Sequence, residues 1–203
     1  MRTREDAIMF RANIIRKLAK ARPDLCKHSG VGFWPVPVMI PLVLAKCIYL
    51  IHKEWLDQIQ ASNYDTAEML TEIRTRLTHL AAEGDLGEDH AGIYMREHPD
   101  AKKIKMDAAP FFKAYQTILD KNDPFILLGF VYSVEAGSLE AIKALVATGM
   151  ISNEKFAKLH MVEEVEHDKL AEEIKQFILK SEYAHRFAQG CNLHDQLYEQ
   201  IVG

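Results

Sequence analysis

Residues 153–180 read "NEKFAKLHMVEEVEHDKLAEEIKQFILK", and their pattern predicts one long amphipathic helix. At about 100° per residue, His160, Glu164 and His167 project from this helix within roughly 60° of one another. Steps of three and four residues continue the same stripe with mostly apolar side chains, namely Phe156, Ala171, Ile174 and Ile178. The stripe is therefore expected to face a core, with one carboxylate and two imidazoles at its centre.

These three polar side chains would need partners inside a core. Burying a carboxylate and two imidazoles without partners costs several kcal/mol. A bound cation accepts lone pairs from all three groups, so the pattern favours a metal site over a solvated acidic face. Glu163 and Glu166, which flank the stripe, fit the solvated face instead.

A second predicted helix, residues 124–148, places Glu135 in an apolar stripe made by Leu128, Val131, Leu139 and Ile142. An isolated carboxylate there would be expelled or neutralised, so Glu135 needs either a distant cationic side chain or a metal ion. Tyr132, one turn earlier, is a candidate catalytic residue that would hydrogen-bond a ligand or carry a radical. Its alternative role is ordinary packing with a satisfied hydroxyl.

A carboxylate-rich site for two metal ions takes about six protein ligands, so a further segment should contribute. Two pairs share the spacing Glu-x6-His. Glu72 and His79 lie on a predicted helix, 65–83, on a face that looks solvent-exposed. Glu83 and His90 straddle the glycine-containing break "EGDLGEDH". Spacing alone leaves both pairs open.

The remaining sequence is also helical in pattern, because strand-like alternation is absent over any useful length. Asp123-Pro124 is a helix start signal, and Gly149 is a stop signal. We expect one all-α domain over residues 1–203, a bundle of about seven helices. The helical segments are expected at 4–21, 38–60, 65–83, through "HAGIYMRE", and at 107–120, 124–148, 153–180 and 183–201.

Composition and charge limit the partners and the cellular location that we expect for this protein. The net charge of −4 is spread without a basic block, which argues against nucleic acid and against a polybasic membrane patch as partners. The most apolar stretch, "VPVMIPLVLAKCIYLI", contains two prolines and Lys46 and is short for a membrane span. The N-terminus lacks the apolar run of a secretory signal. Three cysteines far apart suggest reduced thiols, so we expect a cytoplasmic location.

Three motifs carry a resemblance to a known family. "AEGDLGEDHAGIYM" (82–95), "VYSVEAG" (131–137) and "LHMVEEVEHDKLAEE" (159–173) resemble the haem-oxygenase-like di-metal oxidases and oxygenases. The resemblance covers roughly residues 70–180 and implies a haem-oxygenase-like bundle. It also implies six metal ligands, in this order: Glu83, His90, Glu135, His160, Glu164 and His167.

Three carboxylates and three imidazoles without a thiolate suit iron better than structural zinc, with manganese as the alternative. The resemblance implies two iron ions per chain and O2 as co-substrate. It further implies oxidation of a small molecule, such as an amine or amino acid, in a biosynthetic pathway. An external electron donor and a homo-oligomer are compatible with that chemistry.

Other readings stay open at this point. A ferritin-like site would use "EVEH" (164–167) and "EYAH" (182–185), but only fourteen residues separate these motifs. A metal-free member of the same helical superfamily, similar to thiaminase-type hydrolases or the quinone-cofactor oxidase, would not need six groups at metal spacing. A non-catalytic interaction protein would use its acidic helix as a binding surface.

Overall fold

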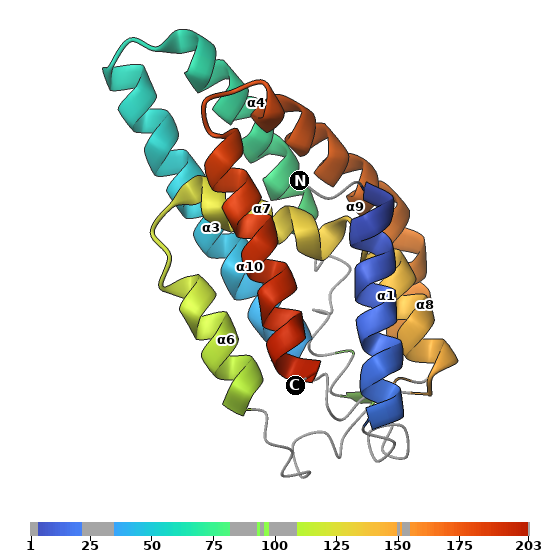
Figure 1. Ribbon diagram of the computed structural model, residues 1–203. Coiled ribbons are helices and arrows are strands. Elements are labelled where there is room, and N and C mark those ends of the chain that lie inside the picture. The colour runs from blue at the N-terminus through green and yellow to red at the C-terminus, as the bar shows by residue number, and fades with distance from the viewer. Residues whose placement is uncertain are drawn as a thin grey trace.

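The computed structural model describes residues 4–21, 35–81, 93, 96–97, 109–149, 151 and 155–202. Within these ranges the chain is helical and contains no strand, which confirms the all-α prediction (Figure 1). The haem-oxygenase-like arrangement stays a prediction. The helices are α1 (Arg4–Ala21), α3 (Pro35–Gln60), α4 (Tyr64–Ala81), α6 (Ala109–Leu119), α7 (Pro124–Glu135), α8 (Ser138–Ala147), α9 (Lys155–Leu179) and α10 (Ala184–Val202).

The predicted helix 124–148 is wrong in one respect, because the chain bends by 45° between α7 and α8. Gly137 at the break has low helix propensity. The Ser138 hydroxyl donates to the carbonyl oxygen of Val134 at 2.9 Å, and so competes for an acceptor that a continuous helix would use. The other predicted helix ends in the described ranges agree with the structure to within three residues.

Helix α7 lies inside the bundle, between α10, α3 and α9 (Figure 1). Every residue of α7 except Ile126 is buried. Its start is fixed by Asp123, whose Oδ1 accepts from the backbone N–H groups of Phe125 and Ile126 at 2.9 and 3.1 Å. Pro124 at the first helical position needs no such acceptor.

Two glycines bring α7 and α10 into backbone contact. A Cβ atom added at Gly129 would lie 1.9 Å from the carbonyl oxygen of Phe187, and one added at Gly190 would lie 2.0 Å from that of Ile126. Both distances are far below any van der Waals contact. The close approach of these helices therefore requires the absence of a side chain at both positions.

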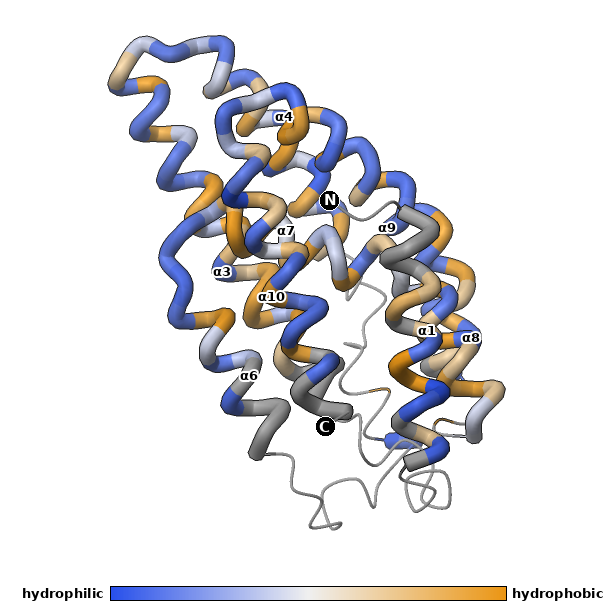
Figure 2. Tube along the Cα trace, in the orientation of Figure 1, coloured by the Kyte–Doolittle hydropathy of each residue, from blue (hydrophilic) through white to orange (hydrophobic). Residues whose placement is uncertain are grey.

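Helix α9 covers another side of α7 and also contacts α4 and α8. The exposed residues of α9 include Lys158, Glu166 and Lys169 but also Val162 and Val165, and hydrophilic and hydrophobic residues alternate along its trace (Figure 2). Arg76 of α4 bonds Glu173 of α9 at 2.8 Å, and His79 lies 3.3 Å from Glu166. A smaller second core joins α1 to α8 through side chains that include Ala12, Ile15, Ala141 and Ile142.

The described helices were compared with the length and hydropathy that a membrane span requires. None of them is by itself both long and apolar enough to cross a bilayer. Helices α7 and α8 pass that test only when they are taken together across their bend.

Candidate metal centre

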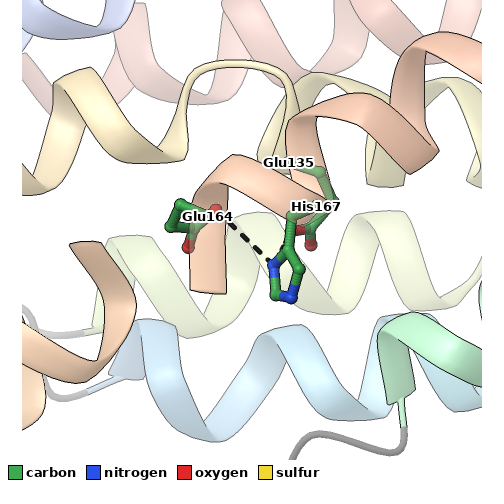
Figure 3. Close-up of side chains that lie close together, drawn as sticks. All are labelled: Glu135, Glu164 and His167. Carbon is green, nitrogen blue, oxygen red and sulfur yellow. Dashed lines mark hydrogen bonds and ion pairs between the residues drawn. The ribbon is translucent and has the colours of Figure 1, made fainter. Parts of the chain in front are cut away.

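Glu135, Glu164 and His167 meet between α7 and α9, and we refer to them as the buried triad (Figure 3). One potential ligand atom from each lies within 4.8 Å of the others. Nδ1 of His167 is 3.1 Å from Oε2 of Glu135 and 3.5 Å from Oε2 of Glu164. All three residues are buried, with 8%, 4% and 5% of their surface exposed in that order.

Local sequence explains why the triad converges. Glu164 and His167 are three residues apart on α9, so their side chains project from one face of the helix. Glu135 is the last residue of α7, immediately before the bend, and its side chain reaches α9 from the neighbouring helix. The apolar stripe predicted for α9 is confirmed at Ala171 and Ile174, which are almost fully buried.

The two carboxylates of the triad control the protonation of His167. Burial by itself would lower the pKa of the imidazole, because the charged form is desolvated. Hydrogen bonds and charge interactions with Glu135 and Glu164 outweigh burial and raise the pKa to about 10. At neutral pH His167 is therefore an imidazolium held between two carboxylates. The triad as a whole then carries one net negative charge.

The donor chemistry of the triad fits a metal ion. Two carboxylates and one imidazole from two different helices offer oxygen and nitrogen ligands without a thiolate, a set suited to divalent transition metals. A divalent cation in place of the imidazolium proton would balance both carboxylates and leave the group neutral. The triad can therefore hold a metal ion.

The structure brings together three of the six predicted ligands. His160 lies one turn before Glu164 on α9 and is half-buried, outside the group whose ligand atoms lie within 4.8 Å. Glu83 and His90 fall outside the described residues. That these three residues complete a larger metal site stays a prediction.

The competing Glu-x6-His pair occupies the surface, as its flanking residues suggested. His79 has 57% of its side chain exposed and faces Glu166, while Glu72 pairs with Arg76 at 2.7 Å.

The ferritin-like alternative is also disfavoured by position. Glu182 and His185 of "EYAH" are exposed around the start of α10, and the His185 ring bonds Gln189.

Tyr132 has its own polar partners, which sequence reasoning did not identify. Its hydroxyl donates to Oε2 of Glu172 at 3.4 Å, and the Lys175 ammonium lies 5.4 Å from the centre of its ring. Lys175 also donates to both carboxylate oxygens of Glu172 at 3.0 Å. Burial is the largest cause of the raised pKa of Tyr132. The described contacts therefore fit ordinary packing with a satisfied hydroxyl, and no sequence spacing between α7 and α9 could have indicated them.

Comparisons of the chain with models of protein families, with curated proteins and with solved structures each find no match.

Proposed function

We propose that this protein is a non-haem di-iron oxidase or oxygenase that uses O2 to oxidise a small amine-like or amino-acid-like substrate. The observation that carries the proposal is the buried triad, because it concentrates two carboxylates and an imidazole in an apolar interior. The second metal ion, the choice of iron over manganese and the use of O2 are supported by the motif resemblance. That resemblance adds Glu83, His90 and His160 as ligands.

Each residue of the triad has a definite part in this proposal. Glu135 and Glu164 supply carboxylate oxygens, and His167 supplies a ring nitrogen once its extra proton has left. When bound, the iron ions would supply the electrons that O2 requires. Burial of all three residues keeps water away from the carboxylates and strengthens their attraction for a cation.

Metal content is the first test. Protein expressed in iron-supplemented medium is expected to contain about two iron ions per chain, the number of a dinuclear site. Glu135→Gln preserves the size of the side chain but removes its charge, and we expect it to abolish iron retention. Glu140→Gln is a matched control on the adjacent helix α8, where Glu140 is partly exposed and pairs with Lys143 at 2.6 Å. Iron loss from both variants would show an effect that is not specific to the triad, and iron retention by Glu135→Gln would reject the triad as the site.

The same comparison can be made within α9. Glu164→Gln should empty the site, whereas Glu166→Gln should not, because 66% of the Glu166 side chain is exposed.

A further pair of variants decides between the two Glu-x6-His motifs. We expect His90→Ala to lose metal and His79→Ala to retain it; the reverse result would reject the assignment of Glu83 and His90.

Protonation of His167 provides a second readout. Because a metal ion must displace a proton from an imidazole whose pKa is about 10, metal affinity should rise with pH across the neutral range. Calorimetric titration with Fe2+ under anaerobic conditions, in buffers of different ionisation enthalpy, should detect the released proton. Metal binding without proton release would contradict the use of His167 as a ligand.

Oxygen chemistry needs its own measurement. After anaerobic loading with Fe2+, exposure to air should consume O2 and change the visible absorption, and candidate amines or amino acids should accelerate O2 uptake. A folded protein that binds no metal would favour the metal-free or non-catalytic alternatives. A protein that binds iron but does not react with O2 would retain the metal site and reject the oxidase.

A further inference from the structure

A partly open cavity is formed by α1 and α10, two helices that contact each other (Figure 1). Its volume is about 580 Å³, within the range of roughly 300 to 1,000 Å³ that small-molecule sites occupy. We call it the α1 cavity, because α1 supplies most of its described lining. That lining consists of Phe10, Asn13, Ile14, Arg16, Lys17 and Lys20 of α1 and Glu199 of α10.

The lining changes from apolar to basic along α1. Ile14 is buried in the main core, and Phe10 packs against the same core. Lys17 and Lys20 follow on the same side of the helix, because steps of three or four residues return to one face. Phe10 and Lys20 are separated by about 15 Å along the helix axis. The α1 cavity therefore has an apolar end and a basic end.

The basic end carries more positive charge than the described residues around it neutralise. Arg16, Lys17 and Lys20 contribute three positive charges and Glu199 contributes one negative charge, which leaves a net charge of +2 on the described lining. The whole chain, by contrast, has a net charge of −4. Lys17 and Lys20 are exposed and form no ion pair with any described residue. Arg16 and Lys20 are four residues apart on one helix, so their like charges repel each other, and a bound anion would relieve that repulsion.

Asn13 orients the guanidinium group at this end of the cavity. Nη1 of Arg16 donates to Oδ1 of Asn13 at 3.1 Å. A guanidinium has five N–H donors in one plane, so this bond leaves donors for a second acceptor. The oxygens of a phosphate group match both the fork of a guanidinium and the point charge of an ammonium group.

We propose that the α1 cavity binds a soluble phosphate monoester with an apolar body. The apolar body lies against Phe10 and Ile14. The phosphate accepts hydrogen bonds from Arg16, Lys17 and Lys20. A phosphate monoester carries a charge of about −1.5 to −2 at pH 7, which balances the net charge of the described lining, whereas a carboxylate would balance half of it.

Isothermal titration calorimetry with decyl phosphate, below the concentration at which it forms micelles, tests the proposal on the full chain. We expect one site per chain and weaker binding in high salt, because salt screens exposed charges. Decanol lacks the phosphate and inorganic phosphate lacks the apolar body, so each should bind far more weakly. Decyltrimethylammonium has the opposite charge and should not bind.

Charge variants locate the site. Lys17→Gln and Lys20→Gln should each weaken the binding of decyl phosphate about tenfold, because each removes a charge-assisted hydrogen bond. Glu199→Gln should strengthen binding, because it removes the carboxylate from the described lining. Lys53→Gln is the matched control, since Lys53 is exposed on α3, outside the cavity. It should bind decyl phosphate like the unchanged protein, and circular dichroism should show the same helix content in all variants.

Three results would overturn the proposal. The first is no binding of dispersed decyl phosphate, including the case in which the protein sediments with vesicles that contain phosphatidic acid. The second is equal binding of decanol or decyltrimethylammonium, which would show contact with apolar surface alone. The third is an equal effect of Lys17→Gln and Lys53→Gln, which would place the anion elsewhere. Glu135→Gln should bind decyl phosphate normally, so failure of the α1 cavity and failure of the metal site are distinguishable.

Discussion

Helix α7 packs against its two neighbours α10 and α9 in opposite ways. Toward α10, Gly129 and Gly190 remove side chains so that backbones touch. Toward α9, the helix presents Glu135 and Tyr132, whose polar groups reach His167 and Glu172. The first contact is steric and leaves no room for a ligand, whereas the second holds charged groups together inside the bundle.

This difference links the α7–α10 contact to the stability of the fold and the α7–α9 contact to the candidate metal site. A contact made of backbone and apolar side chains is stabilised by close packing alone and has no dependence on pH. A contact made of buried ionisable groups costs desolvation energy and depends on their protonation. The α7–α9 side is therefore the one whose properties should change with metal, whereas the contact at Gly129 and Gly190 should not respond to it.

The largest expected effect is a loss of stability of the metal-free protein at high pH. The pKa of His167 is raised from about 6.5 in the unfolded chain to about 10 in the folded one. Its contribution is fully present below the unfolded value and is lost as pH rises through the folded value, by several kcal/mol in total. Chemical denaturation between pH 6 and 10 measures this loss.

Variants assign that pH dependence to the triad. His167→Gln should be less stable at neutral pH and should have a flatter profile, because the titrating imidazole is gone. His79→Ala should keep the slope of the unchanged protein, since His79 is exposed. An identical slope in His167→Gln would mean that other groups cause the effect.

The next largest effect is expected on the steric side. Gly129→Ala inserts a methyl group 1.9 Å from a backbone oxygen of α10, so the helices must move apart. We expect a loss of about 3 kcal/mol in the free energy of unfolding. Gln189→Ala, an exposed position beside Gly190, should change stability little. If Gly129→Ala unfolded at the same denaturant concentration as the unchanged protein, the close approach of α7 and α10 would be wrong.

The smallest effect concerns the start of α7, where Asp123 caps the helix and also bonds Arg186 of α10 at 2.8 Å. Asp123→Ala removes both interactions and should cost about 1 to 2 kcal/mol. Asp123→Asn retains a capping oxygen and should recover most of that loss. Thermal unfolding of the two variants separates the cap from the ion pair, and equal losses would assign the effect to the charge.

Sequence periodicity predicted much of the fold and part of the site. The apolar stripe through Glu164 and His167 identified the inward face of α9, and the setting of Glu135 predicted its burial correctly. The break after Glu135 was missed, because apolar periodicity continues through it while Gly137 and Ser138 interrupt the backbone hydrogen bonds.

The sequence by itself determined the helices and which face of each would be buried, because those properties follow from the spacing of residues a few positions apart. Only the tertiary structure decided that α7 and α9 run antiparallel, with Glu135 opposite His167 and Tyr132 opposite Glu172. Such pairings depend on the register between helices, which is set by packing of distant segments such as the glycine contact with α10. Local spacing carries no information about that register.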